Sequence, residues 1–376
     1  MLFISNHDIC RTVPSAAFIQ SQSNKSVFHW LTVLNKRDMS QNLKLSILDL
    51  AYYTENDPTP GHVLQHSTEV ARLADRLGYH RYWFAEHHNS AALMSMFPEI
   101  MIAHVAAHTE RIRVGSGGVM LPNHSALSVA ERFSMLEALH PGRIDLGIGR
   151  APGTDGRTAL ALRRSWEICK EDTFPGQLDD LLGYFAHDLP SDHPFVNVIA
   201  NPDPSLTPAL YMLGSSSGGV QFALEKGLGF VFAGQINAEM AVPMLRFYQD
   251  HFKPSRYYAA PKSILSISVF TAETEEEAHY LAAPTLLMWT LLATGKRFKT
   301  FPTSKEANDY PYTLQEKAIR EQQLSKFVIG TPGKVAEQLH DWADKTGVDE
   351  IMLVDGYAET EARNNGYTLL AKEFGL

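Results

Sequence analysis

Short apolar runs alternate with longer amphipathic stretches from residue 43 to the C-terminus. Apolar runs bounded by glycine or polar residues predict buried β-strands, and apolar residues three and four apart predict helices. The predicted strands are 45–50, 81–84, 111–114, 143–148, 209–213, 229–233, 263–270 and 350–355. The predicted helices are 60–77, 98–108, 125–139, 216–226, 238–252, 273–293, one from 331, and 360–374. This alternation predicts an α/β protein with a (β/α)₈ TIM barrel and insertions, rather than an open doubly wound sheet.

Three segments depart from the alternation. Residues 1–42 are rich in Ser, Asn and Gln, and we interpret them as a disordered N-terminal extension or a wrongly assigned start, with Met39 the functional start. A docked helix at 26–34 is the alternative. Residues 151–208 are too long for a simple crossover and predict an insertion within the domain at 43–376. Residues 294–325 are polar, and we expect a mobile loop or lid there.

Composition narrows the class of protein. The 376 residues are 44% hydrophobic and 20% charged, with a net charge of −9, so a nucleic-acid partner is not expected. Cys10 and Cys169 stand alone, which argues against a disulfide framework or a zinc site and favours a cytoplasmic protein. No apolar run approaches the roughly 20 residues that span a bilayer, so no membrane association is expected.

Polar or glycine residues follow three of the predicted strands at once. The segments are Glu86-His87-His88-Asn89 after 81–84, 115–118 after 112–114, and 149–153 after 144–148. In a (β/α)₈ barrel the active site is built from the loops that follow the strands. The pattern therefore predicts an enzyme whose ligand is flat or phosphorylated.

Glu86, His87 and His88 are the candidates for acid–base chemistry. Neighbouring side chains at a strand end point in opposite directions, so at most one imidazole should face the barrel axis. The alternative is an imidazole pair whose hydrogen bonds are satisfied by nearby helices. A metal site is not predicted, because the other strand ends supply glycine, serine and arginine instead of convergent ligands.

The glycine-rich strand ends are candidates for cofactor binding. Gly117 and Gly118 would let a flat ring approach the backbone, although a bulge or tight turn is the alternative. Arg150, next to Gly149, suits a phosphate through its planar fork of donors, or else it forms a surface ion pair with Asp155 or Glu86.

Residues 214–219 form a Gly-Ser loop between a strand and a helix. Ser215, Ser216, Ser217 and Gly218 offer hydroxyls and backbone N–H groups at a helix start, which is an arrangement that binds anions. The alternative is a plain serine N-cap, which needs only one hydroxyl. Neither a Walker loop, a dinucleotide fingerprint nor a Gly-x-Ser-x-Gly elbow is present.

Together these motifs resemble the bacterial luciferase-like flavin monooxygenase family over residues 43–376, in its non-luminescent, single-component-like branch. The motifs are AEHHN at 85–89, VGSGGVMLPNH at 114–124, LHPGRIDLGIGRAPG at 139–153 and LGSSSGG at 213–219. The resemblance implies a (β/α)₈ barrel that uses reduced FMN and O₂ to insert one oxygen atom into a small organic substrate. It also implies a homodimer and a separate flavin reductase.

The resemblance assigns roles residue by residue. His87 matches the histidine that acts beside the flavin C4a position, with Glu86 and His88 as its neighbours in the catalytic site. Gly117 and Gly118 match a pair joined by a non-proline cis peptide beneath the flavin ring. The residues matched to phosphate contacts are Arg150, Ser215 and Gly218, with Ser216 and Ser217 in the same loop.

The chain also departs from the light-emitting members of this family. Gly149 stands where they carry a reactive cysteine, Gly214 where they carry a glutamate, and Gly218 where they carry a threonine. These differences argue against luminescence and a long-chain aldehyde substrate.

Other functions remain open at this point. The first is a deazaflavin-dependent oxidoreductase that transfers hydride without oxygen. The others are a flavin-binding protein without turnover and a metal-dependent barrel hydrolase. We expect substrate specificity to lie in 151–208 and 294–325.

Overall fold

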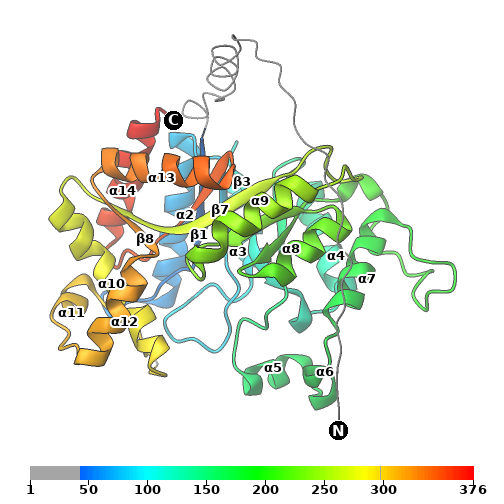
Figure 1. The fold of residues 1–376 in the computed structure, drawn as a ribbon. Coiled ribbons are helices and arrows are strands. Elements are labelled where there is room, and N and C mark those ends of the chain that lie inside the picture. Colours follow the sequence, from blue (N-terminus) through cyan, green and yellow to red (C-terminus); the bar gives the residue numbers. More distant parts are fainter. Residues whose placement is uncertain (1–42, 297) are drawn as a thin grey trace, which may run out of the picture. The chain divides into compact units, whose positions relative to one another are not determined.

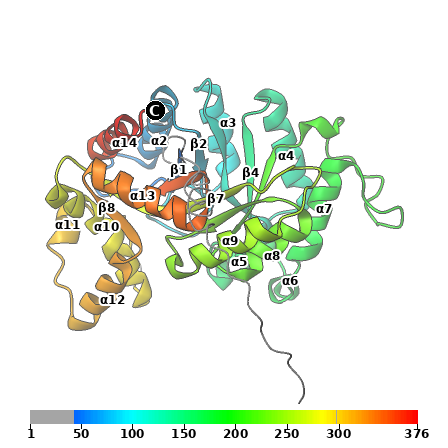
Figure 2. The same cartoon turned by 45° about the horizontal axis from the view of Figure 1, so that its top comes forward.

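The computed structural model describes residues 43–296 and 298–376, in which eight parallel strands close into a barrel (Figures 1 and 2). Strands β1 to β7 pair in chain order, β7 pairs with β9, and β9 pairs with β1. Their bounds are β1 Lys44–Asp49, β2 Arg81–Phe84, β3 Arg113–Met120, β4 Ile144–Gly149, β5 Ala209–Gly214, β6 Gly229–Ala233, β7 Ser263–Thr271 and β9 Glu350–Val354. The predicted barrel is confirmed. The interpretation of residues 1–42 lies outside the described residues.

Helices surround the barrel in Figure 2 and follow the predicted ranges closely. Thr59 begins α2 by accepting a hydrogen bond from the His62 amide, and Gly78 ends it in the left-handed conformation, with φ of 93°. The helices that follow the strands are α2 Pro60–Leu77, α3 Pro98–Ala107, α4 Ala126–Leu139, α8 Ser217–Lys226, α9 Ala241–His251, α10 Glu275–Ala293, α13 Pro332–Thr346 and α14 Thr360–Phe374. Of the helices that the structure describes, none is long and apolar enough to cross a membrane.

A short strand missed by the sequence analysis, β8 (Phe327–Gly330), pairs with the end of β7. Strand β7 is nine residues long, so its first half pairs with β9 and its last four residues pair with β8. The sequence prediction omitted β8 because this strand lies outside the closed ring of barrel strands, so the alternation of eight strands and helices did not require it.

The predicted insertion at 151–208 carries three helices, α5 (Gly156–Arg163), α6 (Trp166–Lys170) and α7 (Phe174–Ala186). Helix α7 packs against α4 and buries one apolar face, which includes Phe174, Leu178 and Phe185. The insertion is therefore attached to the barrel by a hydrophobic contact of its last helix.

The segment at 294–325, predicted as a loop, contains two helices, α11 (Ser304–Asn308) and α12 (Leu314–Leu324). Each begins with a reciprocal capping box, Thr303 with Glu306 and Thr313 with Glu316. The low apolar content of the segment predicted a loop, although the two capping boxes are helix start signals in the sequence. The predicted mobility of the segment stays a prediction.

The amino-terminal end of the barrel is filled by buried charges. Arg81 of β2 pairs with Asp145 of β4 (2.7 Å) and with Glu350 of β9 (2.5 and 2.9 Å). Asp145 also accepts hydrogen bonds from Arg113 (2.6 and 2.9 Å) and from the Trp83 indole (2.9 Å). Buried ions persist where each is paired and hydrogen-bonded, so this network holds one end of the barrel closed.

We expect Asp145→Asn to lower the free energy of unfolding by about 3 kcal/mol, because it leaves Arg81 and Arg113 without a shared carboxylate. Urea denaturation at neutral pH measures this loss. The control is Asp341→Asn, which breaks the exposed Lys345–Asp341 pair and should change the free energy by less than about 0.5 kcal/mol. Equal effects of the two substitutions would contradict the assigned role of Asp145.

The same variant should show a specific pH dependence. Burial alone would raise the pKa of Asp145, but Arg81 and Arg113 outweigh burial and hold that pKa below its ordinary value. A lowered pKa stabilises the fold above the unfolded-state pKa of about 3.9, and the contribution is lost as the pH falls. The difference between wild type and Asp145→Asn should therefore shrink in acid.

Candidate active site

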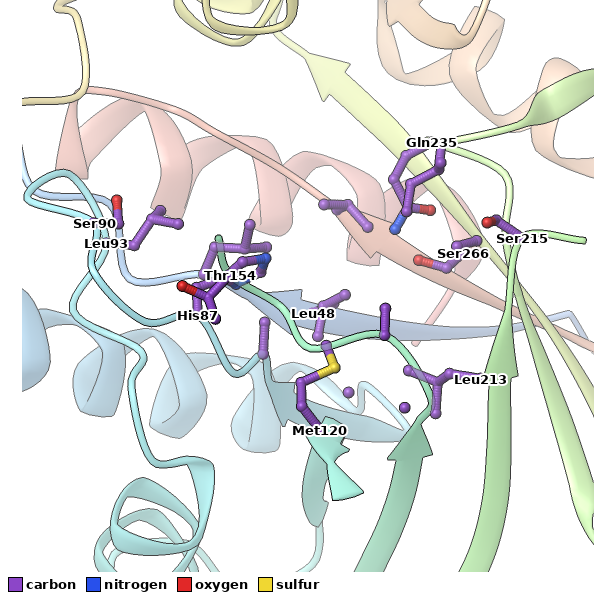
Figure 3. Close-up of a pocket in the computed structure, with 18 of the residues that line it drawn as sticks. Leu48, His87, Ser90, Leu93, Met120, Thr154, Leu213, Ser215, Gln235 and Ser266 are labelled. Carbon is purple, nitrogen blue, oxygen red and sulfur yellow. The ribbon is translucent and has the colours of Figure 1, made fainter. Parts of the chain in front are cut away.

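A cavity of about 890 Å³ opens at the carboxyl ends of the strands. Its wall takes residues from the end of every barrel strand, as expected of a (β/α)₈ active site. In Figure 3, His87 and Thr154 lie at one side of it, and Ser215, Gln235 and Ser266 lie at the other. The residues from strand ends are Leu48, Leu50, Ala85, His87, Gly117, Met120, Gly149, Arg150, Leu213, Gly214, Ser215, Val231, Ala233, Gln235, Ser266, Ser268, Met352 and Val354.

Glu86 is fully buried behind the cavity wall and accepts three hydrogen bonds. One carboxylate oxygen accepts from His88 Nε2 at 2.7 Å and lies 2.9 Å from His124 Nε2, while the other accepts from the Met120 amide at 2.9 Å. Burial alone would raise the pKa of Glu86, but these hydrogen bonds outweigh it and lower the pKa. The carboxylate is therefore ionised near neutral pH and organises the groups around it.

His87 lines the cavity, and its Nδ1 is buried without a hydrogen-bond partner among the described residues. Burial lowers the pKa of His87 below its ordinary value, against the opposing effect of the Glu86 carboxylate. The imidazole is therefore neutral near neutral pH and can accept or donate a proton at the cavity wall. Both histidines line the cavity, so the prediction that at most one faces it is not confirmed. They differ in their hydrogen bonds, since the His88 ring is bonded to Glu86 and the His87 Nδ1 has no partner among the described residues.

Glycines form part of the cavity floor. Strand β3 continues through Gly117 and Gly118, which are joined by a cis peptide, and its register against β4 shifts between Gly117 and Val119. A Cβ added to Gly118 would lie 2.7 Å from the carbonyl oxygen of Gly147. The bulge expected as the alternative is therefore present, and Gly118 lies close to the backbone of β4. The approach of a flat ring to Gly117 and Gly118 stays a prediction.

Arg150 lies against the Gly-Ser loop that starts α8. A Cβ on Gly218 would be 3.2 Å from its guanidinium, which also lies 5.8 Å from the ring centre of Phe222 on α8. Arg150 does form a surface ion pair, but with Asp172 at 2.7 Å rather than with either predicted partner. About half of its side chain is exposed, so it remains available to an anion at the cavity mouth.

Ser216 occupies the N-cap position of α8, yet its side chain makes no capping hydrogen bond. The plain N-cap interpretation of the serines is therefore wrong. Ser215, Ser216 and Gly218 border the cavity, and the first amides of α8 have no side-chain cap. This combination of uncapped amides, hydroxyls and a nearby arginine is suited to a phosphate.

Two further polar groups face the cavity without partners in the described part of the chain. They are the Ser266 hydroxyl, on a residue that is 2% exposed, and the amide oxygen of Gln235. Buried polar atoms are normally hydrogen-bonded, so these two atoms indicate that the cavity normally contains a polar ligand or water.

Comparison with known proteins identifies the family. The model for luciferase-like monooxygenases matches residues 45–350. The chain belongs to the luciferase-like monooxygenase family. It is 41% identical to the uncharacterized protein YceB of Bacillus subtilis, over 88% of this chain and 99% of that protein. It is 31% identical to the N-acetyl-S-alkylcysteine monooxygenase of Bacillus subtilis, over 88% and 97%. The crystal structure of apo-MsnO8 shares 37% identity with a TM-score of 0.79, covering 90% of this chain and 99% of that one.

More distant structures with the same fold use different cofactors. The oxygenating constituent of 3,6-diketocamphane monooxygenase, in complex with FMN, is 16% identical with a TM-score of 0.61, over 88% and 96% of the two chains. An F420-dependent secondary alcohol dehydrogenase is 12% identical with a TM-score of 0.64, over 89% and 99%. At these identities the likeness shows the fold alone. The luciferase-like fold therefore includes both FMN- and F420-dependent proteins.

The structure brings most of the predicted site residues to one cavity. His87, His88, Gly117, Gly149, Arg150, Ser215, Ser216 and Gly218 line it. Glu86, Gly118 and Ser217 do not belong to its wall, since Glu86 lies behind the wall and Ser217 is exposed.

The sequence analysis missed several cavity residues. Met288, Trp289 and Leu292 at the end of α10, with Phe298 beyond it, form an apolar part of the wall. No local motif marks them, because they reach the cavity only when α10 packs over the barrel. The predicted specificity segments contribute less, since their described residues in the wall are 151, 152, 154, 155 and 298.

Convergent metal-ligand atoms are present, contrary to the expectation that the strand ends supply only glycine, serine and arginine. His124, which follows β3, converges with Glu86 and His88, and their ligand atoms lie within 4.8 Å of one another. Hydrogen bonds already use these atoms. The absence of a metal thus stays a prediction.

Proposed function

We propose that this chain is an FMN-dependent monooxygenase that uses reduced FMN and O₂ to insert one oxygen atom into a small organic substrate. The observation that carries the proposal is a single cavity with an unpartnered imidazole nitrogen at one side and an anion-suited loop at the other. Family membership supports the oxygenase chemistry, since relatives that this chain covers over 96% and 97% of their length are named monooxygenases.

The residues present fit a flavin mononucleotide. Arg150, Ser215, Ser216 and Gly218 would hold the phosphate, and the backbone at Gly117 would lie against the flat ring system. The unpartnered oxygens of Gln235 and Ser266 offer hydrogen bonds to the polar parts of the cofactor.

Reduced FMN, when bound, supplies the electron pair that activates O₂. The protein's own task is to orient the reactants, exclude water and manage protons. His87 is the catalytic residue in this proposal, since its neutral Nδ1 can hold or move a proton at the cavity wall. The apolar side chains of Met288 and Trp289, with the segment at 294–325 as a lid, would restrict water.

We further propose that reduced FMN comes from a separate reductase, because the sequence carries no nicotinamide-binding fingerprint.

A homodimer is also proposed. Helices α3 and α4 lie side by side, joined by the Glu99–Arg132 ion pair, and they expose Ile100, Met135 and Leu139 by about two-thirds. Large exposed apolar side chains on two neighbouring helices suit a second copy of the chain.

The cofactor proposal predicts that reduced FMN binds more tightly than riboflavin or the deazaflavin F420 in an anaerobic titration. Arg150→Ala should weaken FMN binding about tenfold, since a charge-assisted phosphate contact is lost, and should leave riboflavin binding unchanged. Arg157→Ala on α5 is the matched control for a lost surface arginine. A preference for F420 would move the protein to hydride transfer, and binding of none of the three would refute the cofactor assignment.

The role of His87 predicts that His87→Ala slows oxygenation of an accepted substrate by roughly a hundredfold, in line with general acid–base catalysis. FMN affinity should change by less than about twofold, because no phosphate contact is assigned to His87. The assay follows product by mass spectrometry across a panel of thioethers, ketones and aldehydes. Unchanged turnover would remove His87 from the mechanism.

The homodimer predicts that Ile100→Asp converts the protein to a monomer in sedimentation equilibrium, because a charge would be buried in an apolar interface. Leu314→Asp, at an apolar side chain that is 88% exposed on α12, is the control and should leave the mass unchanged. A wild-type monomer would refute the proposed interface.

A further inference from the structure

We propose that His124, Glu86 and His88 form a positioning triad that fixes the His87 imidazole at the cavity wall. The catalytic meaning of the triad rests on the function proposed above, whereas its geometry does not. None of these roles follows from the local motif, because His124 lies 38 residues from Glu86 in the chain.

The first observation is that one carboxylate oxygen of Glu86 lies at hydrogen-bond distance from two imidazoles. Glu86 Oε1 lies 2.7 Å from His88 Nε2 and 2.9 Å from His124 Nε2, so both rings are expected to present Nε2–H toward it. Both rings then donate to one carboxylate in a buried site. A carboxylate bonded in this way fixes the orientation of both rings, since each donor has one direction in which it can point.

The surroundings of the triad are also fixed. The Phe97 ring stands edge-on to His88 and His124, with ring centres 5.2 and 6.3 Å apart. Gln177 of α7 donates to the His124 carbonyl at 3.0 Å. The second oxygen of Glu86 accepts from the amide of Met120, a residue whose side chain lines the cavity.

Hydrogen bonds of the main chain also hold the backbone around His87 in place. The His87 amide donates to the Ser95 carbonyl at 2.9 Å, and the Thr154 hydroxyl donates to the His88 carbonyl at 3.2 Å. His87 therefore lies between two anchored neighbours, Glu86 and His88, while its own Nδ1 has no partner in the described chain. A side chain that makes no hydrogen bond through Nδ1 depends on its neighbours for its orientation.

A metal ion is the competing occupant of the same three side chains. We favour the hydrogen-bonded triad because both imidazole nitrogens lie at hydrogen-bond distance from one oxygen, and the other oxygen is taken by a backbone amide. In a tetrahedral site each ligand would instead direct its lone pair at a common centre about 2 Å away.

The first test uses the protein without cofactor. Imidazole N–H protons hydrogen-bonded to a buried carboxylate should appear in ¹⁵N-histidine NMR spectra as slowly exchanging signals from His88 and His124. His124→Ala should remove one signal, shift the other, and shift the ring signal of His87, which is assigned from its absence in His87→Gln. His124→Gln retains a side-chain N–H donor and should leave His87 close to its wild-type position.

The second test measures reoxidation of protein-bound reduced FMN by air without substrate. We expect hydrogen peroxide release to be about tenfold faster in His124→Ala and no more than about threefold faster in His124→Gln, because proton delivery is no longer controlled. FMN affinity should stay within about twofold in both variants. The control is His108→Ala, an exposed histidine on the surface near α3.

Three results would overturn the triad. They are unchanged His87 signals in His124→Ala, equal behaviour of the Ala and Gln variants, and one equivalent of metal in the purified protein by mass spectrometry. Failure of the wild type to bind FMN would refute only the proposed function, since the NMR test needs no cofactor.

Discussion

The buried positive charge of Arg81 is the constraint on which the barrel depends. Its guanidinium lies between carboxylates of β4 and β9, each two strands away from β2, so the ion pairs cross the interior instead of joining neighbours. Charges placed there must be fully paired, because desolvation of an unpaired ion would cost several kcal/mol. This filled end leaves the opposite end open, and there the strand ends surround a cavity.

Local signals predicted the fold where they were strong. Pro60 and Gly78 bracket α2 within one residue, and apolar runs located the barrel strands, except that β3 was predicted at 111–114 and in fact extends to Met120. Local signals failed for elements whose stability does not come from burial of their own apolar residues in a regular pattern. Strand β8 exists because β7 is long enough to pair with two strands, and α12 exposes most of its surface, so neither shows a clear apolar period.

The residues of the candidate site also fall into those that could be predicted from the sequence and those that could not. His87 and Arg150, which closely follow a strand, could be predicted, because strand ends meet at one edge of a barrel. Gly117 was also predicted, although it lies within β3 and not after it. His124 and Ser266 could not be assigned, although both follow or lie in predicted elements. Their importance comes from contacts with Glu86 and from an unpartnered hydroxyl, and both require the three-dimensional structure.

The apolar wall on α10 has a consequence for how this family can diversify. Met288, Trp289 and Leu292 belong to a helix outside the barrel strands, whereas Gly117, Gly149 and Ser215 lie in or directly after the strands. Substitutions on that helix can reshape the cavity without changing the residues at the strand ends. A lineage, or a directed-evolution library, could therefore explore new compounds by changing one helix turn while inheriting an unchanged reaction centre.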